Sequence, residues 1–294
     1  MRLLRIAFAA SILLAGVLAQ GSVRADERIK VVASFTILAD FVRNVGGDRV
    51  DLVALVGPDA DAHVYTPSPA DAKTIAAAKL VVVNGLGFEG WLPRLVKSSG
   101  GTARIVVATD GIVPLKEPAG GHHSVDPHAW QSVSNAKVYA ENIRRALAEV
   151  DPASADSYRA NAERYVVQLD ALDRDVRAMV AQIPEARRKV ISTHGAFGYF
   201  AAAYGVTFVA PQGVSTDSEP SARDLARIIA QIRKEKIPAI FLENISDPRL
   251  IRRVAAETGA KIGGTLYSDS LTDEKGEAPT YIDMVRHNIK TLQD

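Results

Sequence analysis

Short apolar segments rich in β-branched residues alternate along this chain with segments whose apolar residues recur at helical spacing. This alternation predicts a mainly parallel sheet covered by helices, because each helix carries the chain back to the start of the next parallel strand. The strands expected in the first part are 29–34, 50–56, 80–83 and 103–107. The helices expected between them are 37–45, 70–78 and 88–97.

The middle of the chain interrupts the alternation. Two long helical segments, 134–149 and 152–182, follow one another with no strand signal between them, and Ile183-Pro184 ends the second. In the second segment apolar residues recur at spacings of three, four and eight, which predicts one buried stripe along a long helix. That stripe comprises Tyr158, Val166, Leu169, Leu172, Val176 and Val180.

The alternation then resumes, with expected strands at 189–192, 206–209, 239–242 and 261–266. The expected helices are 196–204, 222–235, 249–258 and 280–292. We therefore predict an α/β fold of two lobes, each a mainly parallel sheet flanked by helices, joined by one long connecting helix. The expected bounds are 26–150 for the first lobe, 151–184 for the connecting helix and 185–294 for the second lobe.

The first 25 residues have the features of a cleavable export signal. A basic start is followed by an apolar run at 6–19, which is short for a membrane span. Val23 and Ala25 are small residues at the positions that a signal peptidase reads, so we expect cleavage after Ala25, with Ala19 as second choice. An uncleaved anchor is the alternative, and the polar residues 20–22 argue against it.

Charge and cysteine content exclude several classes of protein. Removing the export segment leaves 32 basic and 34 acidic residues, about −2, which argues against a nucleic-acid partner. The absence of cysteine excludes disulfides, thiolate metal ligands and a lipidated cysteine. We therefore expect a soluble, monomeric, non-lipidated protein in the periplasm of a Gram-negative bacterium.

Two of the six histidines follow expected strands, where α/β folds commonly place their chemistry, and a third lies in a loop before a helix. His63 follows the strand expected at 50–56, and His194 directly follows the strand expected at 189–192. His128 lies in a loop just before a helix, and Asp269 follows the strand expected at 261–266. If these loops meet, two side chains from each lobe face the cleft between the lobes.

Three imidazoles and one carboxylate can complete a tetrahedral shell around a borderline-soft metal ion such as zinc. Each of these residues could instead have a role that involves no metal. A single loop histidine is more often a solvated surface residue, and Asp269 can also be a turn former or a helix cap. Spacing alone does not prove that the four side chains converge.

Four local sequences resemble those of one family. His63-Val64-Tyr65-Thr66-Pro67-Ser68-Pro69 resembles the HxYxPxP signature of the zinc- and manganese-binding solute-binding proteins of ABC importers. Asp126-Pro127-His128-Ala129-Trp130 resembles the DPHxW element of that family. The segments at 194–200 and 266–271 are similar to those that carry its third ligand and its final Asp. The resemblance runs from about residue 29 to the C-terminus, in the same order.

This resemblance implies two α/β lobes, one long connecting helix and an ion held between the lobes by His63, His128, His194 and Asp269. It also implies an ABC transporter membrane permease as partner and high-affinity binding without catalysis. Members with Glu at the third ligand are generally linked to manganese, whereas His194 makes this site richer in nitrogen, which favours Zn²⁺. Mn²⁺ remains the alternative.

Further polar residues have weaker assignments. His122 and His123 replace the long His-rich loop of many zinc-importing relatives, and they are either solvated or a handoff point for a periplasmic metallochaperone. Asp126 could orient His128, and Glu243 could face the same cleft or cap a neighbouring turn. The polar segment 215–220 is expected to cap the following helix.

The remaining candidates are assigned to packing or to solvent. We expect His287, on the last helix, to be exposed, and Trp130 and Tyr65 to wall off the metal site. A secreted zinc hydrolase is the main alternative function, but a catalytic zinc ion keeps an open position, and neither HExxH nor GxSxG occurs. A cell-surface adhesin is a third reading, which the export signal without a lipid anchor disfavours.

Overall fold

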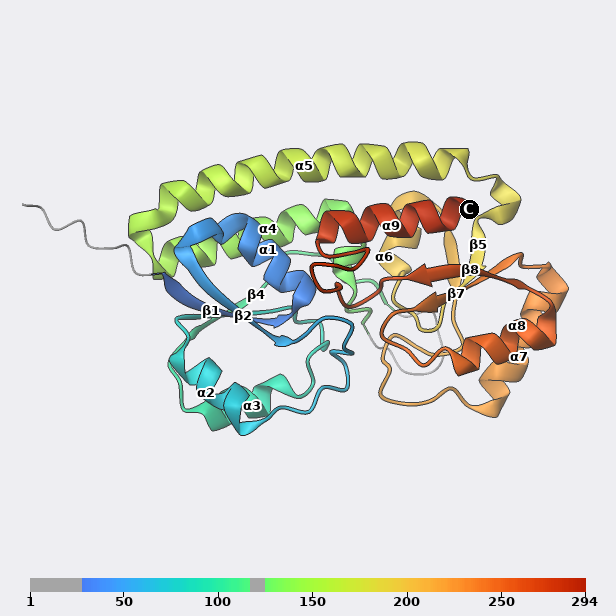
Figure 1. The fold of residues 1–294 in the computed structure, drawn as a ribbon, viewed down its shortest axis with the longest axis horizontal. Coiled ribbons are helices and arrows are strands. Elements are labelled where there is room, and N and C mark those ends of the chain that lie inside the picture. Colours follow the sequence, from blue (N-terminus) through green and yellow to red (C-terminus); the bar gives the residue numbers. More distant parts are fainter. Residues whose placement is uncertain (1–27, 117–124) are drawn as a thin grey trace, which may run out of the picture.

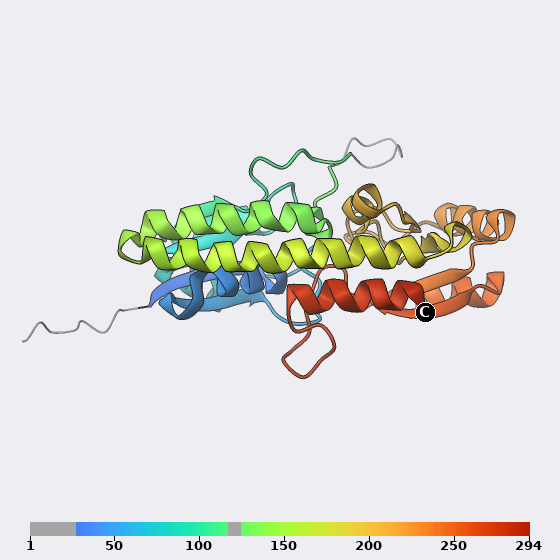
Figure 2. The same cartoon turned by 90° about the horizontal axis from the view of Figure 1, so that it is seen from above.

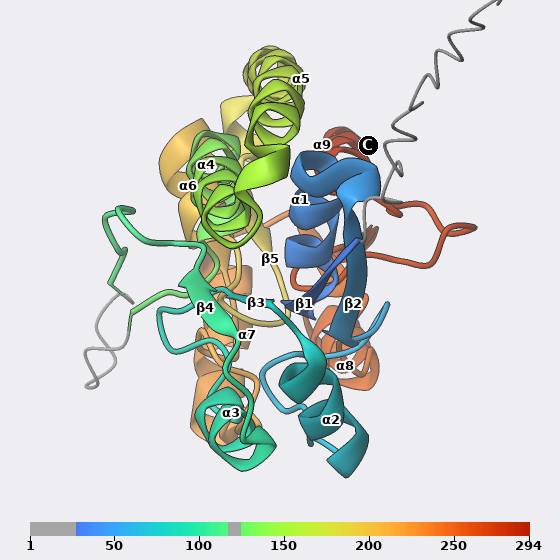
Figure 3. The same cartoon turned by 90° about the vertical axis from the view of Figure 1, so that its left-hand side faces the viewer.

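The computed structural model describes residues 28–116 and 125–294. The first lobe is built on a four-stranded parallel sheet in the order β2-β1-β3-β4 (Figure 3). Its strands are β1 (Ile29–Phe35), β2 (Val50–Val56), β3 (Leu80–Val83) and β4 (Arg104–Val107). Helices α1 (Thr36–Gly46) and α4 (Val133–Val150) cover one face, and α2 (Pro69–Ala77) and α3 (Leu92–Ser99) cover the other (Figure 3).

The second lobe repeats this plan with a four-stranded parallel sheet in the order β6-β5-β7-β8. The strands are β5 (Lys189–Ile191), β6 (Thr207–Val209), β7 (Ala239–Glu243) and β8 (Lys261–Leu266). Helices α6 (Gly198–Tyr204) and α9 (Tyr281–Gln293) lie on one side, and α7 (Ala222–Glu235) and α8 (Arg249–Thr258) on the other (Figure 1).

One long helix, α5 (Ala155–Gln182), runs along both lobes beside α4 and α9 (Figure 2). Its 28 residues give a length of about 42 Å at about 1.5 Å per residue. The buried positions form a continuous stripe, namely Tyr158, Ala162, Tyr165, Leu169, Leu172, Val176 and Val180. Among the described residues, the helices are either too short or too polar to cross a bilayer.

The predicted architecture is confirmed: two lobes, each with a parallel sheet flanked by helices, and one long helix joining them. Helix α2 begins with a capping box, in which the Ser68 side chain accepts the Asp71 N–H. The long helix begins slightly later than predicted, since 152–154 form a 3₁₀ turn before it. The predicted export segment, 1–25, lies outside the described residues.

The prediction of a helix at 88–97 is wrong for its first turn, since α3 begins only at Leu92. The reason is Glu89, whose buried carboxylate accepts the backbone N–H groups of Asn84 and Gly85 and the hydroxyl of Ser34. These bonds hold 84–91 as a turn at the end of β3. In this turn the Asn84 amide donates to the carbonyl of Pro127 and so supports the loop that contains His128.

Asp40 on α1 is a buried carboxylate that gives the folded state a dependence on pH. Its side chain is 2% exposed and accepts the Tyr281 N–H. Burial is the main cause that raises its pKa from 3.8 to about 6, against the lowering effect of that N–H. The folded state therefore holds the proton of the Asp40 carboxyl more tightly than the unfolded chain does. The stabilisation that this proton gives the fold is complete below about pH 4 and is lost as pH rises through 6.

Replacing Asp40 by Asn should remove this dependence, because an amide oxygen can still accept the Tyr281 N–H but never ionises. Between pH 4 and pH 7 we expect the wild type to lose about 2–3 kcal/mol of unfolding free energy relative to the variant. Urea unfolding of the metal-free proteins measures this difference. Asp48→Asn, at a side chain that is 90% exposed, is the control. Parallel pH profiles for wild type and Asp40→Asn would contradict the assignment.

Candidate metal centre

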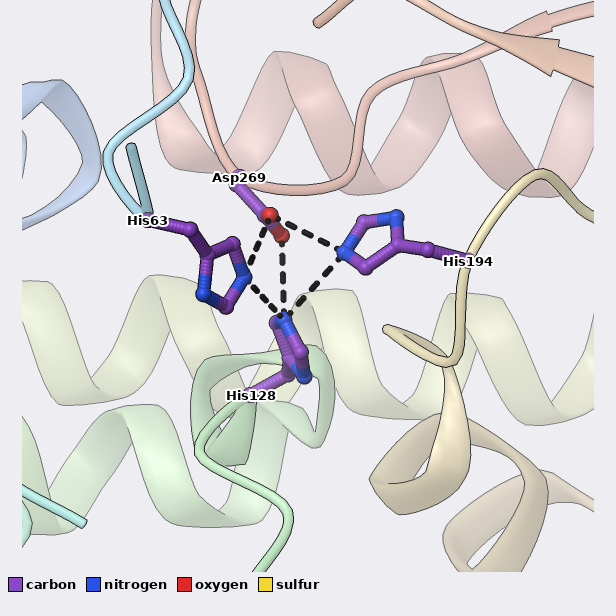
Figure 4. A group of neighbouring side chains, drawn as sticks. All are labelled: His63, His128, His194 and Asp269. Atoms are coloured by element: carbon purple, nitrogen blue, oxygen red, sulfur yellow. Dashed lines mark hydrogen bonds and ion pairs between the residues drawn. The ribbon is translucent and has the colours of Figure 1, made fainter. Parts of the chain in front are cut away.

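Four side chains converge between the two lobes, each from a loop at the end of a regular element (Figure 4). His63 lies in the loop after β2, and His128 immediately precedes the 3₁₀ turn at 129–131. His194 follows β5, and Asp269 follows β8. One candidate ligand atom from each residue lies within 4.8 Å of the other three, and all four residues are buried. The structure therefore brings together the four residues that the sequence singles out.

The spacing of these atoms fits a single ion. His63 Nε2 lies 3.2 Å from His128 Nε2, which lies 3.4 Å from His194 Nε2. Carboxylate oxygens of Asp269 lie 3.3, 3.5 and 3.1 Å from the Nε2 atoms of His63, His128 and His194. Ligand atoms about 2.0–2.1 Å from a tetrahedral zinc ion are about 3.3–3.4 Å from one another. The His63–His128 and His128–His194 distances, and those from Asp269 Oδ2 to His63 and His194, are close to the edge lengths of such a tetrahedron.

Asp269 is the strongest single indication that a cation belongs here. Its side chain is fully buried, and neither carboxylate oxygen has a hydrogen-bond donor in acceptable geometry among the described residues. A buried carboxylate without hydrogen bonds is costly, and proteins compensate it with a paired charge or a metal ion. The three Nε2 atoms that face it are arranged as ligands around a shared centre, as Figure 4 shows.

The pKa shifts follow from this arrangement. Burial by itself would raise the pKa of Asp269, but His194 and His128 lower it well below its ordinary value. Burial would lower the pKa of both histidines, but Glu243 and Asp269 raise that of His194, and Asp269 and Asp126 raise that of His128. The buried carboxylates thus favour positive charge at this point, so protons compete there with a metal cation.

Asp126 fixes the orientation of His128. One oxygen of its carboxylate lies 2.8 Å from His128 Nδ1 and also accepts the His128 backbone N–H at 2.9 Å. Because an ionised carboxylate only accepts, Nδ1 carries the proton and the Nε2 lone pair points to the centre. Gly198 packs against this carboxylate so closely that a Cβ there would lie 2.3 Å from the second oxygen.

Glu243, at the end of β7, does the same for His194. One oxygen lies 2.5 Å from His194 Nδ1, and the other accepts the backbone N–H groups of Thr193 and His194. Three bonds from one buried carboxylate hold both the ring and its main chain. The His194 Nε2 lone pair is thereby also directed at the centre.

His63 is held from its main chain and by aromatic contacts. The Asp61 carboxylate accepts the His63 N–H at 2.9 Å, and the Trp91 indole donates to the carbonyl of Ala62. The His63 ring packs edge-on against Phe88, with ring centroids 4.6 Å apart. The predicted role of Trp130 is also seen, since its buried ring packs against His128.

Two predictions about other residues are wrong, and one cannot be judged. His287 is half-buried rather than exposed, because its ring packs on Tyr267 and its Nε2 lies 3.0 Å from the carbonyl of Thr265. The helix after 215–220 is capped by Ser221, one residue beyond that segment. His122 and His123 lie outside the described residues. Tyr65 is half-buried, and its hydroxyl donates to Asp71.

Sequence reasoning missed the residues that hold the Asp269 loop. The carbonyl of Ser268 accepts the indole N–H of Trp130 and the side-chain amide of Gln131, at 2.9 and 2.7 Å. The hydroxyl of Thr36 accepts the N–H of Leu271. These partners lie more than 130 residues away along the chain, so no local pattern could have paired them.

Comparison with known proteins gives a consistent result. Residues 31–294 match the family model described as zinc-uptake complex component A, periplasmic. The chain is 37% identical over 267 residues to iron-binding protein YfeA of Yersinia pestis, covering 90% of this chain and 86% of that protein. It is 34% identical to manganese-binding lipoprotein MntA of Halalkalibacterium halodurans, covering 92% and 90%.

Two solved structures share the fold and much of the sequence. The periplasmic zinc binding protein TroA from Treponema pallidum is 31% identical with a TM-score of 0.85, covering 90% of this chain and 98% of that one. A Mn-bound periplasmic metal binding protein from Candidatus Liberibacter asiaticus is 31% identical with a TM-score of 0.82, covering 91% and 99%. From the match over 31–294 and these relatives, the chain belongs to the family of periplasmic zinc-uptake complex component A.

Proposed function

We propose that this protein binds one transition-metal ion outside the cytoplasm and delivers it to the membrane permease of an ABC importer. The observation that carries the proposal is that three imidazoles and one carboxylate, all buried, bring their ligand atoms within 4.8 Å of one another. His63, His128, His194 and Asp269 are the proposed ligands. Membership of a metal-uptake family and the metals named for its relatives support this function.

Zn²⁺ is the proposed metal, with Mn²⁺ as the alternative. Three nitrogen donors and one oxygen suit zinc, whereas manganese favours oxygen-rich sites with more ligands. The relatives themselves are named for iron, manganese and zinc, so the donor set rather than the family supports the choice.

We propose binding without catalysis. The two carboxylates that lie beside the proposed ligands, Asp126 and Glu243, each pair with an imidazole Nδ1 and accept backbone N–H groups, so neither is free to serve as a general base. The four proposed ligands fill a tetrahedral shell, which leaves no position for the reactive water of a zinc hydrolase. That the protein is an exported, non-lipidated monomer remains our prediction. His122 and His123 are either solvated or a handoff point for a periplasmic metallochaperone, and both alternatives stay open.

Metal analysis under competition tests this function. The purified protein, stripped of metal and then dialysed against equal concentrations of Zn²⁺ and Mn²⁺, should retain one ion per chain, and that ion should be zinc. Retention should fall as the pH is lowered, because protons then displace the metal from the imidazoles, and the neighbouring carboxylates raise the pKa of His128 and His194. A stoichiometry well below one at pH 7.5 with both metals would overturn the proposal, and retained manganese would overturn the choice of zinc.

A further inference from the structure

Residues 211–220 form an irregular strap between β6 and α7 that contacts the segment carrying His194. The carbonyl of Gly213 accepts the N–H of Gly195, the residue after His194, at 2.9 Å. The two backbones pack so closely that a Cβ on Gly195 would lie 3.3 Å from main-chain atoms of Gly213 and Val214. This end of the strap is therefore fixed to the second lobe.

The strap also reaches across to the first lobe. The Thr216 hydroxyl donates to one oxygen of the Asp61 carboxylate at 2.6 Å, and the other oxygen accepts the His63 N–H at 2.9 Å. Asp61 thus joins the strap to the loop that holds His63. Through Gly195 and Asp61, one segment without ligands of its own contacts the loops of two proposed ligands.

The strap lines a cavity beside the loops of two proposed ligands. A cavity of about 570 Å³ is lined by Gln212, Thr216 and Glu219 of the strap and by Asp61, Val64 and Thr193. Val64 and Thr193 are the direct neighbours of His63 and His194, but the ligands themselves are at most 9% exposed. The strap and the loops of His63 and His194 therefore meet at one cavity.

A second bond crosses between the lobes at the same place. The side-chain amide of Asn244, the residue after Glu243, donates to the Asp59 carboxylate at 2.9 Å. Asp59 and Asp61 belong to the loop that precedes His63. Both hydrogen bonds therefore join this loop to segments that contact the His194 segment. Of the two, only the Thr216 bond involves the strap.

We propose that the strap 211–220 is the gate for metal exchange and that Thr216 is its positioning residue, held closed by Asp61. The inference rests on the proposed function of reversible metal binding. Opening the gate breaks the Thr216–Asp61 bond and gives the cavity access to the ligands. Because entry and exit share this step, Thr216 sets both rates while it changes the equilibrium affinity little.

Thr216→Val tests the gate, since it removes the hydroxyl and keeps the shape of the side chain. Zn²⁺-loaded protein is mixed with excess chromogenic chelator and release is followed by stopped flow. We expect release about tenfold faster than in the wild type, the factor that loss of a hydrogen bond to a charged group implies. Zn²⁺ capture by the metal-free variant should accelerate similarly, so that the dissociation constant stays within about threefold.

Two further variants separate the gate from general damage. Thr216→Ser keeps the hydroxyl and should release zinc at the wild-type rate, and Thr207→Val, the same change at an exposed residue of β6, should have no effect. Release from Thr216→Val within twofold of the wild-type rate would overturn the proposal, as would a dissociation constant that weakens as much as release accelerates. A wild type that binds no zinc would instead overturn the proposed function, which these rates presuppose.

Discussion

Replacing His128 by Ala should weaken zinc binding by at least 100-fold. His128 is central to the candidate centre, with its Nε2 within 3.5 Å of His63, His194 and Asp269. Its loss removes one of four ligands and leaves the buried carboxylate of Asp126 without its imidazole partner. Loss of a group that merely orients a ligand costs about 10- to 100-fold in affinity, so loss of the ligand itself should cost more.

A competition titration with a chelator of known affinity measures this effect. His287→Ala is the matched control, because it removes another half-buried histidine whose contacts, Tyr267 and Thr265, are outside the centre. The control should bind zinc as the wild type does. Equal affinity in His128→Ala and the wild type would exclude His128 as a ligand, and equal losses in both variants would point to damage of the fold.

Replacing Glu243 by Gln should weaken zinc binding by about 10- to 100-fold although this residue touches no metal. The amide oxygen can still accept the N–H groups of Thr193 and His194, which places the amide nitrogen against His194 Nδ1. That nitrogen only donates, so the imidazole proton is driven to Nε2, where it blocks the lone pair that would bind the metal.

The effect of Glu243→Gln should depend on pH differently from loss of a ligand. Its tautomer defect should persist at pH 8, where protons compete less with the metal than at pH 6.5, so affinity should stay below that of the wild type at every pH. Isothermal titration at pH 6.5 and 8, with Glu185→Gln at an exposed carboxylate as control, makes the comparison. Affinity restored to the wild-type value at pH 8 would contradict the orienting role of Glu243.

Much of this fold could be predicted from local sequence, because alternating strand and helix periodicity fixes parallel sheets and leaves their strand ends at a common edge. His63, His194 and Asp269 follow three such strands, so their placement in loops could be predicted directly. That the four side chains converge could not be predicted. Their convergence depends on how α5, and contacts such as that of Trp130 with Ser268, set the two lobes against each other.

The two carboxylates that orient the histidines also differ in how well local sequence predicts their roles. Asp126 is two residues from His128, so its role could be predicted, whereas Glu243 reaches His194 from 49 residues away. The composition of 215–220 predicts a helix cap, but Ser221 has that role, and Thr216 instead bonds to Asp61, 155 residues away. Tertiary pairing, not local propensity, determined these positions.

The most direct test of the proposed function is the position of the metal itself. Crystals of the zinc-loaded protein, measured on both sides of the zinc absorption edge, should show one anomalous peak between the lobes. We expect it about 2.0–2.2 Å from His63 Nε2, His128 Nε2, His194 Nε2 and an Asp269 oxygen. A peak elsewhere, or one at this point with fewer than three of these ligands, would contradict the proposed metal centre.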